Sequence, residues 1–364
     1  MWKNNALSSL LGITTPIVQG PFGGGASSTA LAAIVSNAGG LGSFGAQHLG
    51  PAQIGPLVSE LKTLTSRPFA INLWVGDQDG AVAGFTRDDF DRHVARLQPF
   101  YDELGLQRPE YPNHFGQSFH EQFEALVEAA PPVFSFVFGV PDRRIIDVCR
   151  SRGIVTIGTA TTADEAEALE AGGVDAIVAT GLEAGGHRVS FMRTPEESLI
   201  GGLALIPLVR ARVKVPVIAA GGIATGRGIA AAMMLGADGA QIGTAFLACE
   251  ESGASAPHRQ KLWSEEAQRT ILTKCFTGRL ARGIPNRFAV AMEAFAGDLA
   301  PYPIQRWLTG TLKAAAIAQD RADLTLLWAG QAAPLLQHRS AGELFSSLVR
   351  ETEEAFGWAA TQAP

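Results

Sequence analysis

Short apolar runs alternate with helical segments along the chain from about residue 16. The runs are rich in Val, Ile and Phe and do not alternate with polar residues. That pattern is typical of strands that are covered on both faces of a parallel sheet. Eight such runs occur, over residues 16–19, 41–44, 69–75, 133–138, 154–157, 174–179, 215–219 and 237–242.

Helix signals stand between these runs. Ser27-Ser28 can cap a helix over 31–38, Thr161-Thr162 can cap another that stops at 172–173, and a third helix begins at Thr225 and stops at Gly236. A hydroxyl side chain satisfies the free amides of a first helical turn, and glycine accepts the left-handed conformation at a helix end. The chain therefore reads as repeated strand–helix units.

Eight strands with helical crossovers predict an α/β fold, the (β/α)8 or TIM barrel, which needs about 250 residues. An open, doubly wound sheet is the alternative. It fits less well because its glycine loop follows the first strand, whereas glycine loops here follow several strands. We therefore expect residues 1–250 to form the barrel.

Two segments do not fit the length of a barrel unit. Residues 76–132 form an insertion after the third strand, with 88–97 in helical phase. Residues 251–364 are expected to be a helical extension without strands. We expect both segments to pack over the barrel mouth, as a lid or as the surface of a homodimer.

Composition narrows the class of protein. The chain has 364 residues, 46% hydrophobic and 18% charged, with a formal net charge of −6 and no basic cluster, which argues against nucleic acid as a principal ligand. Cys149, Cys249 and Cys275 are scattered without metal-ligand spacing, as expected of inert thiols in a reducing cytoplasm. The N-terminus has no signal-peptide pattern, and no apolar stretch approaches membrane-spanning length.

Two strand-to-glycine junctions one barrel unit apart predict a phosphate site. Gly221-Gly222 follows the seventh predicted strand and Gly243-Thr244 follows the eighth. Barrel enzymes commonly bind phosphate between these loops, on backbone amides. The loops carry no Lys or Arg except Arg227, which favours a bound cofactor such as flavin mononucleotide (FMN) over a highly charged substrate. Alternatively, these glycines only permit tight turns.

His187 is the candidate catalytic residue. It lies on the loop 181–188, just past the sixth predicted strand, and its ordinary pKa suits proton transfer or stabilisation of an anion. The alternative is a histidine that only fastens the loop to backbone. The other histidines, of which His48 could face the site, have no metal-ligand spacing, and no nucleophile elbow is present, so we expect neither a metal site nor hydrolase chemistry.

The chain resembles the nitronate monooxygenase family, formerly called 2-nitropropane dioxygenases, which are FMN-dependent TIM barrels. Related flavin-containing enoyl-acyl-carrier-protein reductases share the loop 183–187. The motifs 301–305 and 328–331 favour the monooxygenase branch. The matching segments are 16–21, 38–42, 69–73, 136–141, 181–188, 219–223, 237–246, 276–279, 281–283, 301–305 and 328–331.

The resemblance implies a role for particular residues. His187 matches the histidine that meets the nitro or nitronate group, and Tyr302 is a candidate wall of the substrate pocket. The cofactor contacts implied by the resemblance, together with candidates at the strand ends, are Gln19, Gly20, Pro21, Asn72, Gly158, Ala184, Gly185, Gly186, Gly221, Gly222, Gln241, Ile242, Gly243 and Thr244. Some relatives carry a histidine in the fourth strand, where this chain has 135–138 without one, so no role of a second histidine is transferred.

Three functions follow from these patterns. The first is an FMN-dependent nitronate monooxygenase, which converts alkyl nitronates such as propionate 3-nitronate, with O2, to a carbonyl compound and nitrite. The second is an NAD(P)H-dependent flavin reductase of enoyl thioesters or quinones. The third is a barrel acting on a phosphorylated metabolite without flavin. The lack of basic residues in the phosphate loops disfavours the third.

Overall fold

A computed structural model describes residues 2–76 and 82–362. Eight parallel strands form one sheet in the order β1-β9-β8-β6-β5-β4-β3-β2. A parallel bridge between Val18 and Leu41 joins the two outer strands and closes the ring. The strands are β1 (Ile17–Gln19), β2 (Gly42–Gly45), β3 (Phe69–Trp74), β4 (Val133–Val137), β5 (Val155–Ala160), β6 (Ala176–Thr180), β8 (Val217–Ala220) and β9 (Gly239–Ile242). The predicted (β/α)8 barrel is confirmed.

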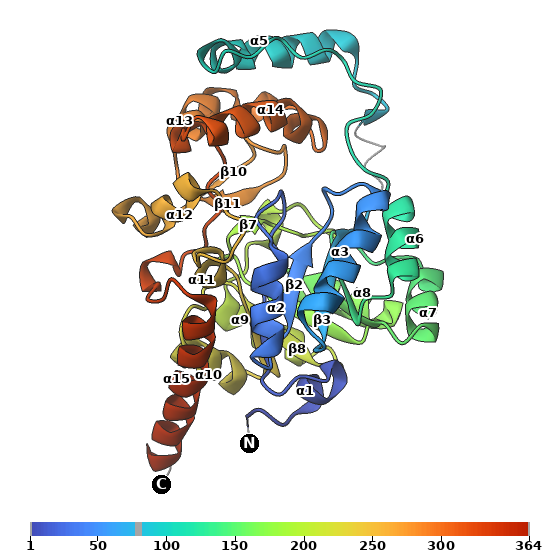
Figure 1. Cartoon of the computed structure of the whole chain (residues 1–364), viewed down its shortest axis with the longest axis vertical. Coiled ribbons are helices and arrows are strands. Elements are labelled where there is room, and N and C mark those ends of the chain that lie inside the picture. The colour runs from blue at the N-terminus through green and yellow to red at the C-terminus, as the bar shows by residue number, and fades with distance from the viewer. Residues whose placement is uncertain (1, 77–81, 363–364) are drawn as a thin grey trace.

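Helices surround the barrel, as Figure 1 shows. The predicted caps hold, since Ser28 accepts from the Leu31 amide and Thr162 from the Glu165 amide. The surrounding helices are α2 (Thr29–Asn37), α3 (Pro51–Leu64), α6 (Phe119–Ala129), α7 (Arg143–Ser151), α8 (Ala163–Gly172), α9 (Gly202–Arg210), α10 (Gly226–Met234), α11 (Thr244–Leu247) and α15 (Ala341–Gln362). The long α15 packs on α10 and α2, which covers the part of the ring after β9.

A short N-terminal helix closes the lower end of the barrel. α1 (Ala6–Leu11) places Leu7 and Leu11 in one cluster with side chains from the strands. The Asn5 amide donates to the Asp238 carbonyl, 2.6 Å away, just before β9 begins. Because the amino ends of the strands are blocked in this way, access to the barrel is from their carboxyl ends.

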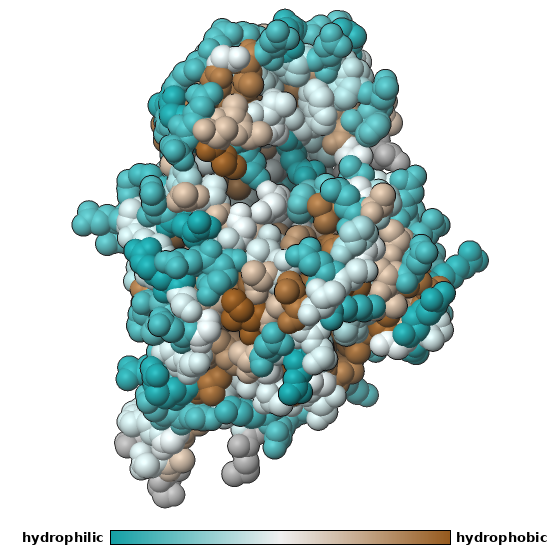
Figure 2. Space-filling model, in the orientation of Figure 1, coloured by the Kyte–Doolittle hydropathy of each residue, from teal (hydrophilic) through white to brown (hydrophobic). Residues whose placement is uncertain are grey.

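The insertion and the C-terminal segment form a cap above those carboxyl ends (Figure 1). Its helices are α5 (Arg87–Glu103), α12 (Ala256–Leu262), α13 (Arg287–Met292) and α14 (Ile304–Ala318), with short 3-10 turns at Glu265–Gln268, Glu293–Asp298, Ala322–Leu324 and Ala333–Leu335. A further 3-10 turn, Glu196–Ser198, precedes α9 in the barrel part of the chain. α5 buries Phe90, Val94 and Leu97 in one cluster with Phe288 and Leu308 of the tail. On the face drawn in Figure 2, the outer surface of this upper part is mostly hydrophilic, as an amphipathic helix on a core requires.

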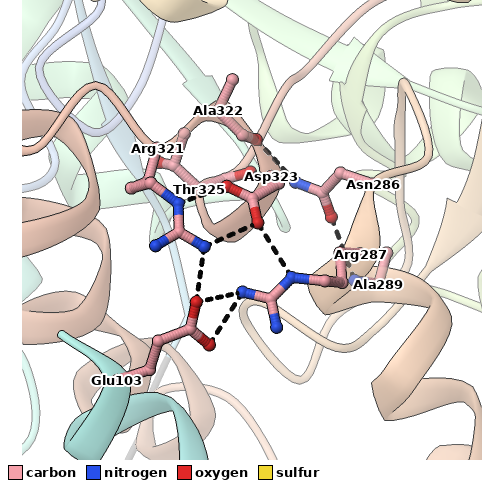
Figure 3. A network of polar contacts seen from close by, with 8 residues as sticks. All are labelled: Glu103, Asn286, Arg287, Ala289, Arg321, Ala322, Asp323 and Thr325. Atoms are coloured by element: carbon pink, nitrogen blue, oxygen red, sulfur yellow. Dashed lines mark hydrogen bonds and ion pairs between the residues drawn. The ribbon is translucent and has the colours of Figure 1, made fainter.

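Charged residues also join the insertion to the tail (Figure 3). Glu103, at the end of α5, accepts from Arg287 at 2.6 and 2.8 Å and from Arg321 at 2.5 Å. Both arginines also donate through Nε to Asp323, each at 2.8 Å. Arg321 beside Asp323 lowers the pKa of that carboxyl to about 2, so the network keeps its charges at ordinary pH. α6 also belongs to the insertion but is not part of the cap, because it packs on α3 and β3 as an ordinary barrel helix.

The expectation of a strandless tail is wrong. β10 (Ile271–Thr273) and β11 (Ala281–Gly283) pair in antiparallel fashion, and β11 also pairs with β7 (Gly186–His187). These strands are only two or three residues long, so they leave no apolar period in the sequence. The small sheet matters because it places His187 opposite Ala281, in a strand rather than in a free loop.

Among the described residues, no helix is both long and apolar enough to cross a lipid bilayer. The three cysteines are buried and free, and burial raises the pKa of each thiol to about 12. They are therefore protonated and unreactive in the folded protein.

Candidate active site

A cavity of about 910 Å³ lies at the carboxyl ends of the barrel strands, beneath the cap. Its floor is made by residues at or just after the strands, and its roof by the tail together with Phe115 of the insertion. The floor includes Gly20, His48, Asn72, Trp74, Val137, Thr159, Thr180, Ala220 and Gln241, and the roof includes Phe276, Thr277, Arg306, Trp307, Lys313 and Trp328. Barrel enzymes carry out their chemistry at this end.

His187 lies in this cavity, inside a group of aromatic rings. The centroid of its ring is 5.0 Å from that of Trp74, 5.5 Å from Trp328 and 6.3 Å from Phe138. Its Nε2 atom is 2.9 Å from Oγ1 of Thr277. Within the described chain, the other ring nitrogen, Nδ1, has no hydrogen-bond partner, so one nitrogen is held while the other is available.

The surroundings keep this imidazole neutral. Burial, followed by the positive charges of Arg279 and Arg306, lowers the pKa of His187 to about 3. The side chain remains partly exposed, but the space it faces is the cavity. At ordinary pH the ligand-free protein therefore presents a proton acceptor here, not a cation.

Polar side chains of the loop itself fix its shape. The Glu183 carboxylate accepts from the Gly202 amide at 2.9 Å, which caps the start of α9. Arg188, 1% exposed, donates to the carbonyls of Gly181 at 2.6 Å, Thr180 at 3.2 Å and Ser198 at 3.3 Å. These bonds hold both sides of His187 in place.

A tail motif packs against the same loop. The backbone at Gly185 approaches so closely that a Cβ atom there would lie 2.6 Å from the Ala329 carbonyl carbon and from the Gly330 nitrogen. The Gln331 amide donates to the Glu183 carbonyl at 2.9 Å. The Gly330 amide donates to Oγ1 of Thr244, also at 2.9 Å. The motif 328–331 thus connects the His187 loop to the predicted phosphate loop.

Both predicted phosphate loops face the cavity. Gly221 and Gly222 follow β8, and Gly243 and Thr244 follow β9. Throughout residues 2–76 and 82–362, the backbone amides of these four residues find no hydrogen-bond acceptor. Gly221 and Gly222 have φ of 96° and 71°, the left-handed region in which successive amides can converge on an anion. The structure thus offers four free donors.

Asn72 and Ser135 form one pair on the cavity floor. They are opposite each other in the β3–β4 register, and the Asn72 amide donates to Oγ of Ser135 at 3.0 Å. Ser135 occupies the fourth strand, which has no histidine in this chain, and both residues line the cavity. The hydrogen bond to Ser135 thereby fixes the orientation of the Asn72 side chain on the cavity floor.

Most predicted site residues come together around the cavity, and four do not line it. Gly20, Pro21, Asn72, Ala184, Gly185, Gly186, His187, Gly221, Gly222, Gln241, Gly243 and Thr244 line it. The Cβ position of Gly158 faces outward, toward Leu169 of α8. Ile242 also faces outward and packs in the hydrophobic cluster that includes side chains of α2. Gln19 is fully buried and accepts from the Ser43 amide at 2.8 Å. Tyr302 lies behind Trp74, with the ring centroids 5.4 Å apart. Their roles stay predictions.

The charged residues of the cavity were missed by sequence reasoning. Arg306 and Lys313 line it, both from α14, and in the part of the chain that the structure describes no Asp or Glu does. Their spacing of seven residues places them on one face of the helix, about 10.5 Å apart along its axis. That spacing was a signal, but only packing shows that this face meets the cavity. In a chain of net charge −6, the cavity is cationic.

The described residues offer no ligand set for a metal ion. Among the described residues, no group of three or more His, Cys, Asp or Glu side chains could hold a metal ion. His48 and His258 both line the cavity, and burial lowers the pKa of each to about 4. His258 contacts the Trp328 carbonyl through Nε2 at 2.9 Å, which is a structural role.

The fold and the cavity define the class of protein, a (β/α)8-barrel enzyme with a cavity at the carboxyl ends of its strands. The model of the nitronate monooxygenase family matches residues 4–351. A probable nitronate monooxygenase of Staphylococcus haemolyticus is 39% identical over 97% of this chain and 98% of its own length. One of Staphylococcus aureus is 38% identical over 97% and 99%. The chain belongs to the nitronate monooxygenase family, and it is a flavin-dependent oxidoreductase.

Solved structures agree with this assignment. A nitroalkane oxidase from Streptomyces ansochromogenes is 38% identical, with a TM-score of 0.89 over 98% of this chain and 100% of its own. FabK from Thermotoga maritima is more distant, at 25% identity and a TM-score of 0.77, with 99% of both chains covered. The resemblance expected from the sequence motifs is confirmed.

Proposed function

We propose that this protein is an FMN-dependent nitronate monooxygenase, which converts alkyl nitronates and O2 to a carbonyl compound and nitrite. The observation that carries the proposal is the cavity itself. It combines a neutral, aromatic-walled His187 with the cations Arg306 and Lys313 and with no acidic side chain among the described residues. Such a site favours an anionic substrate and disfavours a cationic one.

The residues present fit FMN. The four free amides at Gly221, Gly222, Gly243 and Thr244 suit a phosphate, and Asn72, Gly20 and Pro21 lie on the floor where a flat ring can rest. A bound FMN would supply the electron transfer from the nitronate and the reaction with O2. The glycine loops allow close approach of the backbone to such a ligand.

The side chains around His187 then have distinct tasks. Trp74, Phe138 and Trp328 exclude water from one side of the imidazole, which strengthens electrostatic interactions inside the site. Arg306 and Lys313 attract the anion. His187 can contact the nitronate and, where a neutral nitroalkane is the substrate, take the proton from its α-carbon. Thr277 holds the ring through Nε2.

Anaerobic mixing tests the function and separates it from the reductase alternative. The purified protein is mixed with propionate 3-nitronate and, separately, with NADH and NADPH, while the flavin absorbance is followed. We expect reduction by the nitronate and not by the nicotinamides, and release of FMN on denaturation. A colourless protein that binds no FMN after reconstitution contradicts the proposal, and rapid bleaching by NADH alone supports the reductase.

The proposal predicts a pH dependence through Lys313. Burial lowers the pKa of this lysine to about 8, so it carries its charge below that pH and loses it above. For propionate 3-nitronate, whose carboxylate can meet this cation, we expect KM to rise by about tenfold between pH 7 and pH 9, as a charge-assisted contact is lost. A nitronate without a carboxylate should show a smaller rise, because Lys313 then attracts only the charge of the nitronate group.

Variants identify the group responsible. Lys313→Met should have the high KM at every pH and keep its flavin. The matched control is Lys261→Met, which removes a half-buried lysine outside the cavity, paired with Glu266, and should behave as the unmodified protein. A KM rise that persists unchanged in Lys313→Met assigns the pH effect elsewhere.

A further inference from the structure

The turn 277–279 of the tail contacts His187 and packs on the segment 301–303. Gly278 has φ of 81°, and a Cβ atom there would lie 2.5 Å from the Ala300 carbonyl oxygen and 2.6 Å from the Tyr302 nitrogen. Glycine is therefore required for the turn 277–279 to pack on the segment 301–303. This packing fixes the position of the next residue, Arg279.

The Arg279 side chain is held by aromatic rings. Its guanidinium carbon is 3.9 Å from the Phe138 centroid, 4.2 Å from that of Tyr302 and 5.7 Å from that of Trp74. In the part of the chain that the structure describes, the guanidinium has no hydrogen bond or ion pair, and its Nη1 atom is buried. Cation–π contacts compensate only part of the cost of burying a charge, so this placement calls for a function.

The same elements surround His187. Trp74 and Phe138 contact both the imidazole and the guanidinium. Oγ1 of Thr277 lies 2.9 Å from Nε2 of His187, accepts from the Arg279 amide at 3.3 Å and donates to the Arg279 carbonyl at 3.2 Å. Arg279 does not line the cavity, so it stands behind His187 as seen from the substrate space.

We propose that Arg279 is a positioning residue that acts through His187. Its ring-held charge keeps the imidazole neutral and able to accept a proton, while its turn orients the ring through Thr277. The inference rests on the proposed function, because a neutral His187 matters as a proton acceptor in that reaction. Its test does not depend on that function.

The charges that face His187 are few. Arg279 comes from the segment before β11 and Arg306 from α14. Burial is the main cause of the lowered pKa of His187, and the charges of these two arginines lower the pKa in the same direction. From β3, β4 and the segment 328–331 only uncharged aromatic side chains face it, and no carboxylate in the described chain counters the two arginines. Removing Arg279 therefore removes one of the two positive charges that oppose protonation of His187.

The test is a direct titration of His187 in the flavin-loaded protein. Histidine labelled with 13C in the ring is followed by NMR from pH 4 to pH 9, and the signal of His187 is assigned with His187→Asn. We expect no titration above pH 5 in the unmodified protein. In Arg279→Met the pKa should rise by about 1 unit or more, and in Arg279→Lys, which keeps the charge, it should stay low.

Controls and a second readout make the outcome decisive. Arg282→Met, on the adjacent strand, removes an arginine bonded to the Leu182 carbonyl and should leave the His187 titration unchanged. Arg279→Gln repeats the charge removal if the Met variant does not fold. An unchanged pKa in a folded, charge-free variant overturns the inference. So does a raised KM for nitronates without any pKa change, because Arg279 would then bind substrate directly.

The kinetic readout separates this inference from the proposed function. With neutral nitroalkanes, the acidic limb of the kcat profile should move to higher pH in Arg279→Met, while KM for nitronates stays within about twofold. Failure of the unmodified protein to react with any nitronate contradicts the proposed function, yet the NMR titration still reports on Arg279.

Discussion

His187→Asn should lower kcat/KM for neutral nitroalkanes by a factor of about 10² to 10⁴, the usual contribution of a positioned general base. Asparagine keeps a polar group near the position of Nδ1, but it is too short to replace the contact of Nε2 with Oγ1 of Thr277, now 2.9 Å, and it cannot take up a proton. The flavin should remain bound, because the four free amides of the phosphate loops lie elsewhere in the cavity. Steady-state rates together with the flavin absorbance measure both effects.

A comparison of substrates extends this test. Preformed nitronates need no proton removal, so their turnover should fall much less in the variant than that of the parent nitroalkanes. His93→Asn is the matched control, since His93 is buried in α5 outside the cavity. Equal losses for both substrates point to a binding role instead, and retention of full activity removes His187 from the mechanism.

The barrel could be predicted because its strands are buried on both faces. Such strands appear in the sequence as continuous apolar runs, and the run over 133–138 corresponds to β4 at Val133–Val137. The helix caps at Ser28, Thr162 and Thr225 were readable for a similar reason, since each cap is a local interaction within three residues. Local chemistry and long apolar runs both survive in a single sequence.

The cap and the charge of the cavity could not be predicted in the same way. β10 and β11 are three residues each, too short for any period. Arg306 and Lys313 come to the cavity on α14, more than a hundred residues after His187 along the chain, and only tertiary packing brings them there. The predicted phosphate loops carry no Lys or Arg except Arg227, whereas the cavity that they line receives two cations from α14.

Strand alternation explains why predicted site residues divide as they do. On β5, Thr159 faces the cavity while its neighbour Gly158 faces Leu169 of α8. On β9, Gln241 faces the cavity and Ile242 faces the outer helices. Successive residues of a strand point to opposite faces, so a motif that spans a strand end contains both kinds. A family resemblance identifies the motif that belongs to the site. The alternation of side chains along the strand decides which residues of that motif face the cavity.

Gly185→Ala should uncouple the loop 181–188 from the tail. The added Cβ would lie 2.6 Å from two backbone atoms, of Ala329 and Gly330, which cannot rotate away as a side chain could. Overpacking of this kind costs about 1–3 kcal/mol, and a shift of about 1 Å at His187 can cost 10²-fold in rate. We expect a lower unfolding midpoint, loss of activity and weaker flavin binding, because the Gly330 amide also holds Thr244.

The control is Gly357→Ala, at an exposed position of α15 where no atom lies within 4 Å of the new Cβ. This variant should stabilise the protein by about 0.5–1 kcal/mol. If Gly185→Ala unfolds and reacts as the unmodified protein does, the close packing of loop and tail is not what holds His187 in place.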